Sequence, residues 1–377
     1  MKTTKTYVNL LGIALILVGC TTATSHVEDA LQPHTIPIDV EQVDFLPYDS
    51  LVRNIEFIPL ETNEYSMLGE IVDAVFDKEL IVVNSRSQPV CCFDERGKFK
   101  FRLGNVGVGP DEYREINGIS VEDGIIYLYD STVGALLLFD AVTGRFMRRI
   151  KCSDIYAKAY VLDGYVYAST CVDAYRLVSF PLASPAEVSE LYQSKEKLLV
   201  SYKLRKKITR SDGRLFWTNP LWGEVYELKD GRMTSFVVLD FADKAFPKDD
   251  SSHLKELVKK RGYAFQVGDF LMADSLLHLT YHFSGTSMSC WYNLSLQKIC
   301  QLDLLEYLRR LKGGQYHKVQ KMPFVTYESD GWFYQFLHPF KGYSFEESLS
   351  PKYKTYERLQ HMTSDSNPYL VRFQFGL

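Results

Sequence analysis

The chain has 377 residues, of which 46% are apolar and 24% are charged, and its formal net charge is −4. This composition supports a large buried core and excludes a mainly disordered chain. Aromatic residues make up 14%, with 25 Tyr and 23 Phe. Because aromatic side chains suit the half-buried surface of a sheet, the composition favours an all-β fold.

The N-terminal residues have the pattern of an export signal. Lys2 and Lys5 precede an apolar run over residues 7–18, which is too short to span a bilayer as a mature helix. The four residues Leu-Val-Gly-Cys that end at Cys20 resemble the bacterial lipobox, in which the cysteine is acylated and becomes the first residue of the mature chain. The alternative is an ordinary secretory signal with a cysteine at this place by chance.

We therefore predict a lipoprotein signal peptide over residues 1–19 and a lipid anchor at Cys20. Residues 20–40 are polar and contain proline, which is typical of a flexible tether. Several acyl chains on one residue bury enough methylene groups for stable attachment. The expected location is the cell envelope, on the outer membrane, with the membrane as a partner through Cys20 and with the membrane face left open.

The remaining cysteines show no dense spacing that would indicate a disulfide framework. Cys91 and Cys92 are neighbours on an expected strand, so their side chains should point to opposite faces. Two bridges stay open as alternatives, one from Cys152 to Cys171 and one from Cys290 to Cys300.

An internal repeat organises the chain. Residues 78–99 align with residues 123–146, so that Val83 meets Tyr129 and Phe93 meets Phe139 at a constant offset of 46. Each copy holds a turn, an apolar run, a polar loop, a second apolar run that ends in Phe-Asp, and a glycine turn. Several short strands in each forty-odd residues are typical of a propeller blade.

The same turn followed by an aromatic or aliphatic run recurs along the chain and marks the blades. Six such starts occur, at Lys78, Asp123, Asp163, Asp212, Asp274 and Asp330. They predict a six-bladed β-propeller over residues 41–377. The alternating segments at 55–61 and 369–375 should close the ring in the sixth blade, because an unclosed propeller would expose strand edges.

Three helices are expected as insertions in the later blades. Their capping residues place them near residues 251–262, 303–313 and 351–362. They should decorate the blades and do not form a second domain.

The segment from Gly104 to Phe146 resembles an NHL-type propeller repeat. Together with the lipobox, it resembles the six-bladed, TolB-like propeller lipoproteins of Bacteroidetes, many of which have unknown function. The resemblance implies a propeller fold and an envelope location. NHL repeats usually carry a second glycine after the proline, where this chain has Asp111.

The glycines at 104, 107 and 109 do not form a nucleotide-binding loop. A dinucleotide fingerprint needs a third glycine, but Pro110, Asp111 and Glu112 follow Gly109. A Walker loop would need Gly-Lys-Ser/Thr, which is also missing. We interpret the loop as the connection between two blades, and we predict no cofactor.

His278 and His282 stand four residues apart in a segment that alternates like a strand. On a strand they share one face, which keeps a ligand-binding role open. A structural role is favoured, and no metal site is predicted, because no acidic residue accompanies the pair. No Ser, His and Asp arrangement stands out, so catalysis is unsupported without being excluded.

Charge is unevenly distributed along the chain. Residues 201–377 carry 25 Lys and Arg against 19 Asp and Glu, whereas residues 1–200 carry 18 against 28. Three basic stretches, at 203–210, 259–261 and 309–312, could form a rim for an acidic ligand. The residues named for this rim are Lys203, Arg205, Arg309 and Arg310, and solvated strand and helix faces are the competing interpretation.

The sequence therefore predicts a monomeric, lipid-anchored propeller that binds a glycan, a peptide or a partner protein at one end of its axis without catalysis. Nucleic acid is a poor partner for an exported protein near neutrality. One alternative is a lyase or hydrolase that acts on extracellular polymers, which should gather acids, His or a metal at the axis. The other is a scaffold subunit of an outer-membrane uptake assembly.

Overall fold

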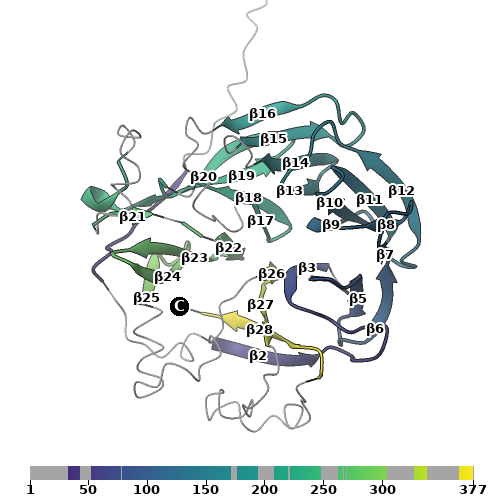
Figure 1. Ribbon diagram of the computed structural model, residues 1–377. Coiled ribbons are helices and arrows are strands. Elements are labelled where there is room, and N and C mark those ends of the chain that lie inside the picture. Colours follow the sequence, from purple (N-terminus) through teal and green to yellow (C-terminus); the bar gives the residue numbers. More distant parts are fainter. Residues whose placement is uncertain are drawn as a thin grey trace, which may run out of the picture. The chain divides into compact units, whose positions relative to one another are not determined.

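The protein is a six-bladed, all-β propeller, as the sequence predicted (Figure 1). The computed structural model describes residues 33–42, 52–77, 79–170, 176–193, 208–219, 221–247, 262–265, 267–268, 270–303, 327–337 and 365–376. Their strands form six main sheets around a common axis, plus one small two-stranded sheet.

Blades one to three each contain four strands in chain order. Blade one comprises β3 (Ile71–Asp77), β4 (Leu80–Ser85), β5 (Val90–Asp94) and β6 (Phe99–Leu103). Blade two comprises β9 (Ile116–Glu122), β10 (Ile125–Asp130), β11 (Ala135–Asp140) and β12 (Phe146–Lys151). Blade three comprises β13 (Lys158–Leu162), β14 (Tyr165–Thr170), β15 (Arg176–Pro181) and β16 (Ser189–Gln193).

The later blades include strands from elsewhere in the chain. Blade four comprises β17 (Ile208–Ser211), β18 (Arg214–Thr218), β19 (Glu224–Lys229) and β20 (Arg232–Asp240). Blade five comprises β21 (Ala264–Phe265), β22 (Phe270–Ala273), β23 (Leu276–Phe283), β24 (Thr286–Asn293) and β25 (Lys298–Asp303). Blade six comprises β26 (Tyr327–Ser329), β27 (Trp332–Leu337), β28 (Tyr369–Phe375) and β2 (Val52–Pro59).

The ring closes in blade six, where strands from both parts of the chain pair. β2 runs antiparallel to β28, with Phe57 opposite Val371 and Pro59 opposite Tyr369. β28 also pairs with β27, so β2 becomes the outermost strand of this blade. This pairing protects edges that an open sheet would leave exposed.

The last residues of the expected tether are part of the propeller. β1 (His34–Pro37) pairs parallel with β20 and adds a fifth strand to blade four. Ile36, Ile38 and Val40 alternate along this segment and are all buried. The prolines nearby suggested a linker, but proline is tolerated in an edge strand.

Side chains from facing sheets form the core between neighbouring blades.

The two copies of the repeat match in their strands, but the constant offset of 46 is wrong in the first apolar run. Val83 lies opposite Cys91, and Leu128 lies opposite Leu137. Val83 therefore corresponds to Leu128, whereas Tyr129 points to the other face, because a shift of one residue exchanges the faces of a strand.

The cysteines are buried on separate faces of their sheets. Cys91 packs in the core between blades six and one, and Cys92 packs in the core between blades one and two, as predicted. Cys290 and Cys300 also pack in different cores, because Cys300 lies opposite Trp291 in the ladder. The alternative of a bridge between these two is wrong, and Cys171 lies outside the described residues.

The predicted blade starts are the hairpins between the first and second strands of each blade. Five of them turn at an aspartate with φ between 50° and 53°. Aspartate tolerates this left-handed conformation better than most residues. These residues are Asp123, Asp163, Asp212, Asp274 and Asp330.

The three expected helices lie outside the described residues. Within the described part of the chain, the one helical segment is the short 3-10 turn η3 (Ala242–Lys244). These residues also contain no helix with the length and hydropathy that a membrane crossing requires.

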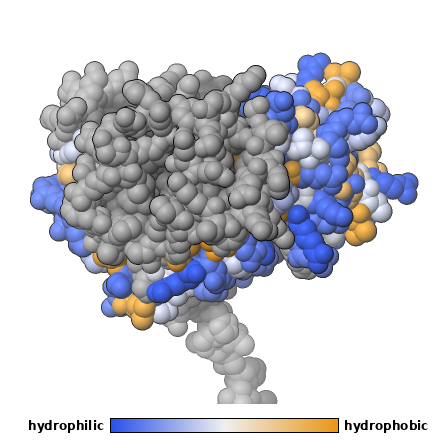
Figure 2. All heavy atoms as spheres, turned by 90° about the horizontal axis from the view of Figure 1, so that it is seen from below, coloured by the Kyte–Doolittle hydropathy of each residue, from blue (hydrophilic) through white to orange (hydrophobic). Residues whose placement is uncertain are grey.

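The surface that Figure 2 shows is largely hydrophilic where it is coloured, with apolar side chains spread among polar ones. Among the residues that the structure describes, the most exposed large apolar ones are Val142, Val108 and Leu296, at 75%, 74% and 63% exposure. They come from three separate segments of the chain, which is ordinary for a globular surface.

Candidate functional site

The innermost strands of the six blades meet at the axis of the propeller (Figure 1). An innermost strand has backbone N–H and C=O groups on its free edge, and these groups need partners. Side chains from other blades supply several of them. The Ser329 hydroxyl donates to the Phe76 carbonyl at 3.1 Å, and the Val161 N–H donates to Ser120 Oγ at 2.8 Å.

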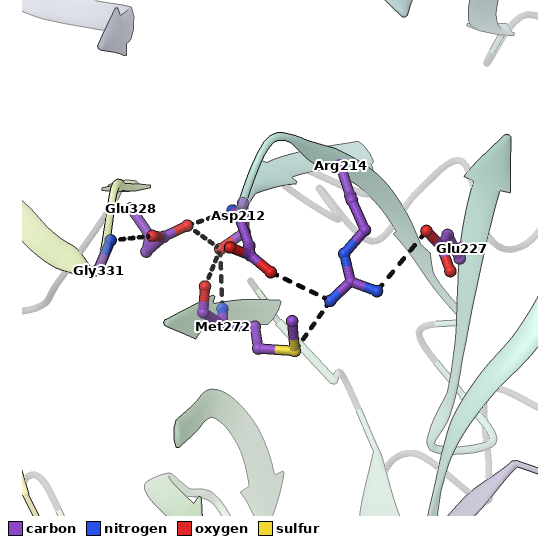
Figure 3. A network of polar contacts seen from close by, with 7 residues as sticks. Asp212, Arg214, Glu227, Met272, Glu328 and Gly331 are labelled. Atoms are coloured by element: carbon purple, nitrogen blue, oxygen red, sulfur yellow. Dashed lines mark hydrogen bonds and ion pairs between the residues drawn. The ribbon is translucent and has the colours of Figure 1, made fainter. Parts of the chain in front are cut away.

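A polar network around Glu328, Asp212 and Met272 joins blades four, five and six (Figure 3). Ser211 Oγ lies 2.7 Å from Glu328 Oε2 and 2.9 Å from the Met272 carbonyl oxygen, and it accepts the Met272 N–H at 2.8 Å. Glu328 also accepts the backbone N–H groups of Asp212 and, at 3.1 Å, of Gly331. Three blades are therefore held together at one buried carboxyl group.

Burial raises the pKa of Glu328 to about 7, although its hydrogen bonds act in the opposite direction. The geometry around Ser211 explains how the protonated form is accommodated. The single hydroxyl proton of Ser211 faces two acceptors, Glu328 and the Met272 carbonyl. When Glu328 is protonated it can donate to Ser211, and the hydroxyl proton of Ser211 is then available to Met272.

Arg214 lies beside this network on β18. It contacts Asp212 Oδ2 at 3.4 Å, Glu227 Oε1 at 3.6 Å and Met272 Sδ at 3.2 Å (Figure 3). Its guanidinium group also lies 5.0 Å from the ring of Phe216. Arg214 is thus paired with carboxylates and packed on an aromatic face.

An axial cavity lies between the inner strands of five blades. Its lining comes from β3, β9, β13, β17 and β26 and consists of Asp73, Ala74, Val75, Phe76, Ile119, Tyr160, Ile208, Thr209, Arg210, Tyr327 and Glu328. On one side of the cavity, the Tyr160 hydroxyl of blade three donates to Asp73 Oδ2 of blade one at 3.3 Å. Polar groups from distant parts of the sequence therefore converge on one concave, partly open space.

Arg210 reaches across the axis from blade four. Its Nη1 and Nη2 atoms donate to the carbonyl oxygens of Val121 at 3.3 Å and Val161 at 2.8 Å. Burial lowers the pKa of this guanidinium group, while the negative charges of Glu122, Asp77 and Asp163 partly oppose the shift. The arginine thus ties the inner edges of blades two, three and four together.

The acidic hairpins lie at the end of the axis where the inner strands finish. Each of the turn residues Asp123, Asp163, Asp212, Asp274 and Asp330 is exposed, and Glu122 accepts the Asp163 N–H. Much of this acidity has a structural origin, because aspartate is favoured at these left-handed turn positions.

Four basic residues were predicted to form a rim, and the structure does not test them. Lys203, Arg205, Arg309 and Arg310 lie outside the described residues, as does Cys20. Arg210 is the last residue of the same basic stretch, and it belongs to the axial cavity.

His278 and His282 both lie on β23, on one face, as predicted. His278 is buried, its Nε2 atom lies 3.0 Å from Ser289 Oγ, and its ring packs on Trp291 at 4.3 Å. Burial lowers the pKa of His278 to about 3 and also lowers that of His282. Neither histidine lines the axial cavity, so the structure does not bring them together with Arg210 or Glu328.

Across the described ranges, no three His, Cys, Asp or Glu side chains form a group that could hold a metal ion. The polar atoms of the axis are instead arranged around backbone groups and one another. What this arrangement offers chemically is hydrogen bonding, one guanidinium charge and a carboxyl group that changes protonation near neutrality.

The glycine-rich loop is filled by its own carboxylate. Glu112 Oε2 accepts the N–H groups of Val108 at 2.8 Å and Gly109 at 2.7 Å. A Cβ atom at Gly107 would lie 2.2 Å from that oxygen. The loop joins β6 to β9, which confirms that it connects two blades, and the backbone donors that a phosphate would need are occupied.

Four residues of the cavity were not predicted from the sequence: Asp73, Tyr160, Thr209 and Glu328. A signal was present, because Arg210 and Glu328 each stand two residues before a turn aspartate. The same position holds Val121, Val161 and Met272 in other blades. A charged residue in this otherwise apolar layer marks the axis.

A family model for a domain of unknown function, DUF4934, matches residues 33–374, which is most of the chain. The chain belongs to the DUF4934 family. The match spans all six blades of the propeller. It names no activity for the family, and none of the curated proteins matches the chain.

Two solved structures from Bacteroides are similar to this DUF4934 protein. One is a Bacteroides fragilis protein described as a "putative exported protein", with a TM-score of 0.69 and 14% identity, and the match covers 91% of this chain and 99% of that one. The other is a member of the DUF4221 family from Bacteroides vulgatus, with a TM-score of 0.47, 11% identity and coverage of 86% and 97%. The first supports the propeller fold, and the second carries no further argument.

Proposed function

We propose that this DUF4934 protein is an exported, lipid-anchored binding module of the cell envelope, with the axial cavity as its ligand site. The observation that carries the proposal is the convergence of polar side chains from four blades on one concave, partly open space. Ligand sites typically combine such a concave space with a few convergent polar groups. The similarity to a Bacteroides protein described as exported supports an extracytoplasmic role.

The bonding of the axial carboxylates favours binding over catalysis. Both oxygens of Glu328 accept hydrogen bonds from backbone groups that hold the blades. Both oxygens of Asp73 are also engaged, one by the Ala74 N–H at 3.0 Å and one by Tyr160. A general acid or base needs a carboxyl group that can reach the substrate, and these groups are committed to the scaffold.

The binding function is tested by applying the purified mature protein to glycan and peptide arrays. A ligand of the axis should bind the native protein and lose affinity when Tyr160 is replaced by Phe. A matched replacement of Tyr65, which is 56% exposed and does not line the cavity, should leave binding unchanged. Equal binding by both variants would move the ligand site away from the axis.

The anchor is tested separately by cell fractionation. A Cys20→Ser variant should leave the membrane fraction and no longer incorporate a labelled fatty acid. Retention of this variant in the membrane would contradict lipid attachment at Cys20.

A propeller enzyme is the second candidate, because the axis does gather acidic groups. Glu328 has a pKa of about 7, which suits a general acid or base, and Asp73 lines the same cavity. Incubation with extracellular polysaccharides should reveal turnover that a Glu328→Gln variant lacks. Turnover by the native protein would replace the binding module with an enzyme.

A further inference from the structure

The outermost strands of blades one and two carry an excess of positive charge. Residues 96–103 and 145–151, which include most of β6 and β12, contain eight Lys and Arg and no Asp or Glu. All of these basic residues except Arg102 are exposed. We call them the basic rim: Arg96, Lys98, Lys100, Arg102, Arg145, Arg148, Arg149 and Lys151.

The two strands lie side by side on the outside of the ring. Phe101 of β6 and Phe146 of β12 both pack against the core between blades one and two. A Cβ atom at Gly144 would lie 2.4 Å from the Phe101 ring, so the turn before β12 touches β6. Lys100 Nζ lies 6.0 Å from the centre of the same ring. The positive charges of both blades therefore form one surface, on the side of the ring away from β20 (Figure 1).

These charges are largely without a neutralising carboxylate. Among the described residues, the one ion pair of the basic rim joins Arg96 to Glu95 at 3.9 Å. Asp94 and Asp140 lie in the adjoining turns, but each of them accepts backbone N–H groups of its own turn. The rim therefore presents a positive field to the solvent.

Protection of the sheet edges does not account for this surface. Charged side chains on an outermost strand prevent edge-to-edge aggregation, and charges of either sign serve that purpose. The outermost strand of blade three, β16, has one acidic and no basic residue, and β2 of blade six has one of each. Eight charges of one sign on two neighbouring blades exceed what edge protection requires.

A polymer with repeated negative charges complements this arrangement. A strand advances roughly 3.3 Å per residue, so Arg149 and Lys151 stand roughly 7 Å apart along β12, and a polymer can engage several cations in more than one register. A protein partner fits less well, because protein interfaces are depleted in lysine and apolar at their centre. Three of the eight residues are lysines, and the one exposed large apolar residue in these two ranges is Met147.

An anionic membrane would also attract a basic surface. The chain enters the propeller at β1, which pairs with blade four, and the order of the cores puts blade four opposite blade one. His34 follows Cys20 by 14 residues, which span at most roughly 50 Å. A compact domain of residues 33–377 is about 50 Å across, so this length is too short to pass around it. The proposed anchor at Cys20 therefore keeps the basic rim away from the membrane that holds it.

We propose that the basic rim of blades one and two binds an acidic polysaccharide. This surface is separate from the axial site, because none of its residues lines the axial cavity. The preference for a polysaccharide over a membrane rests on the proposed lipid anchor.

The test measures binding to partners that differ in charge and in chemical class. Polygalacturonate and chondroitin sulfate are acidic polysaccharides, and dextran is the neutral control. Poly-L-glutamate is an acidic polypeptide, and phosphatidylglycerol vesicles are an anionic membrane. The protein is the mature, full-length chain with Cys20→Ser, so that acyl chains do not contribute to vesicle binding. Calorimetry at low and at high NaCl concentration measures the affinity and its screening by salt.

Two matched double variants locate the surface. Lys100→Glu/Arg148→Glu reverses two charges of the basic rim. Lys229→Glu/Arg232→Glu makes the same change in charge in blade four, outside the rim. All four side chains are exposed, so neither variant removes a buried contact.

At least one acidic polysaccharide should bind at low salt, and its affinity should fall roughly tenfold or more in the rim variant and at high salt. The blade-four variant should change the affinity little, and dextran should not bind. An equal loss in both variants would reveal a general effect of net charge and would overturn the inference.

Two further outcomes would also overturn it. Tighter binding of the vesicles or of poly-L-glutamate would assign the rim to a membrane or to an acidic protein. Failure of both acidic polysaccharides to bind would leave the rim without this ligand. None of these outcomes decides the axial binding function, because the test of that function changes a residue of the cavity.

Discussion

Two polar regions lie at the axis, one around Glu328 and one around Thr209 and Arg210. They differ in how many of their polar atoms form hydrogen bonds within the protein. Around Glu328, groups of blades four and six supply hydrogen bonds to both carboxyl oxygens, and Ser211 links this carboxyl group to Met272 of blade five. Around Thr209 and Arg210, two polar atoms have no partner among the described residues. Both regions include β17, so one short strand contributes a structural junction at Ser211 and spare hydrogen-bonding capacity next to it. One polar region of the axis is therefore bonded by the blades themselves, and the other is bonded only in part.

Removing the junction should have the largest effect. Glu328→Ala leaves the hydroxyl of Ser211 and the N–H groups of Asp212 and Gly331 without their partner. We expect the free energy of unfolding to fall by about 3 kcal/mol, as is typical when a buried network loses one member. Urea unfolding of the mature protein measures this change.

Glu190→Ala is the matched control for this experiment. Glu190 pairs with Arg176 at 3.1 Å, and its side chain is 44% exposed. An exposed ion pair contributes only about 0–1 kcal/mol. If the two variants lose equal stability, Glu328 is not a junction.

The protonation of Glu328 should make stability depend on pH. Its pKa rises from 4.5 to about 7 on folding, so its stabilising contribution is full below pH 4.5 and is lost as the pH rises through about 7. Relative to Glu328→Gln, which does not titrate, the native protein should lose on the order of 2 kcal/mol between pH 5 and 8.

Comparing the two proteins at each pH removes the contribution of other groups. His278 has a pKa of about 3 in the fold, so its titration destabilises the protein at low pH, with the opposite sign. This effect is present in both proteins and cancels in the difference. A difference that stays constant from pH 5 to 8 would show that Glu328 does not titrate in this range.

The blades could be predicted from sequence because their signals are local. A turn followed by an apolar run recurs six times, five of them with an aspartate at the turn, and each copy carries its own hairpin chemistry. β1 was missed because His34–Pro37 pairs with a strand two hundred residues away, and its prolines resemble a linker. The offset error at Val83 and Tyr129 arose because alignment of letters does not determine which face a residue takes.

The candidate site was harder to predict because it is assembled from single residues of separate blades. Asp73 and Tyr160 are 87 residues apart in the chain, and Ser211 and Glu328 are 117 apart. The spacing of the turns predicts that inner strands meet at an axis, but it does not say which side chains meet there. The one signal was the charge of Arg210 and Glu328, which stand two residues before a turn aspartate, where three other blades have an apolar residue.

The smallest expected effect on stability is at Thr209, in the region where polar atoms have no described partner. Thr209→Val keeps the shape of the side chain and removes a buried hydroxyl that has no described partner. We expect the free energy of unfolding to rise by about 1 kcal/mol, because the desolvation cost of that hydroxyl disappears. Ser211 lies two residues further along β17 and forms hydrogen bonds with Met272 and Glu328. Ser211→Ala should therefore lower the free energy of unfolding. Opposite signs at two buried hydroxyls on the same face of one strand would show that Thr209 does not serve stability. A loss of stability in Thr209→Val would instead place its hydroxyl among the groups that hold the blades.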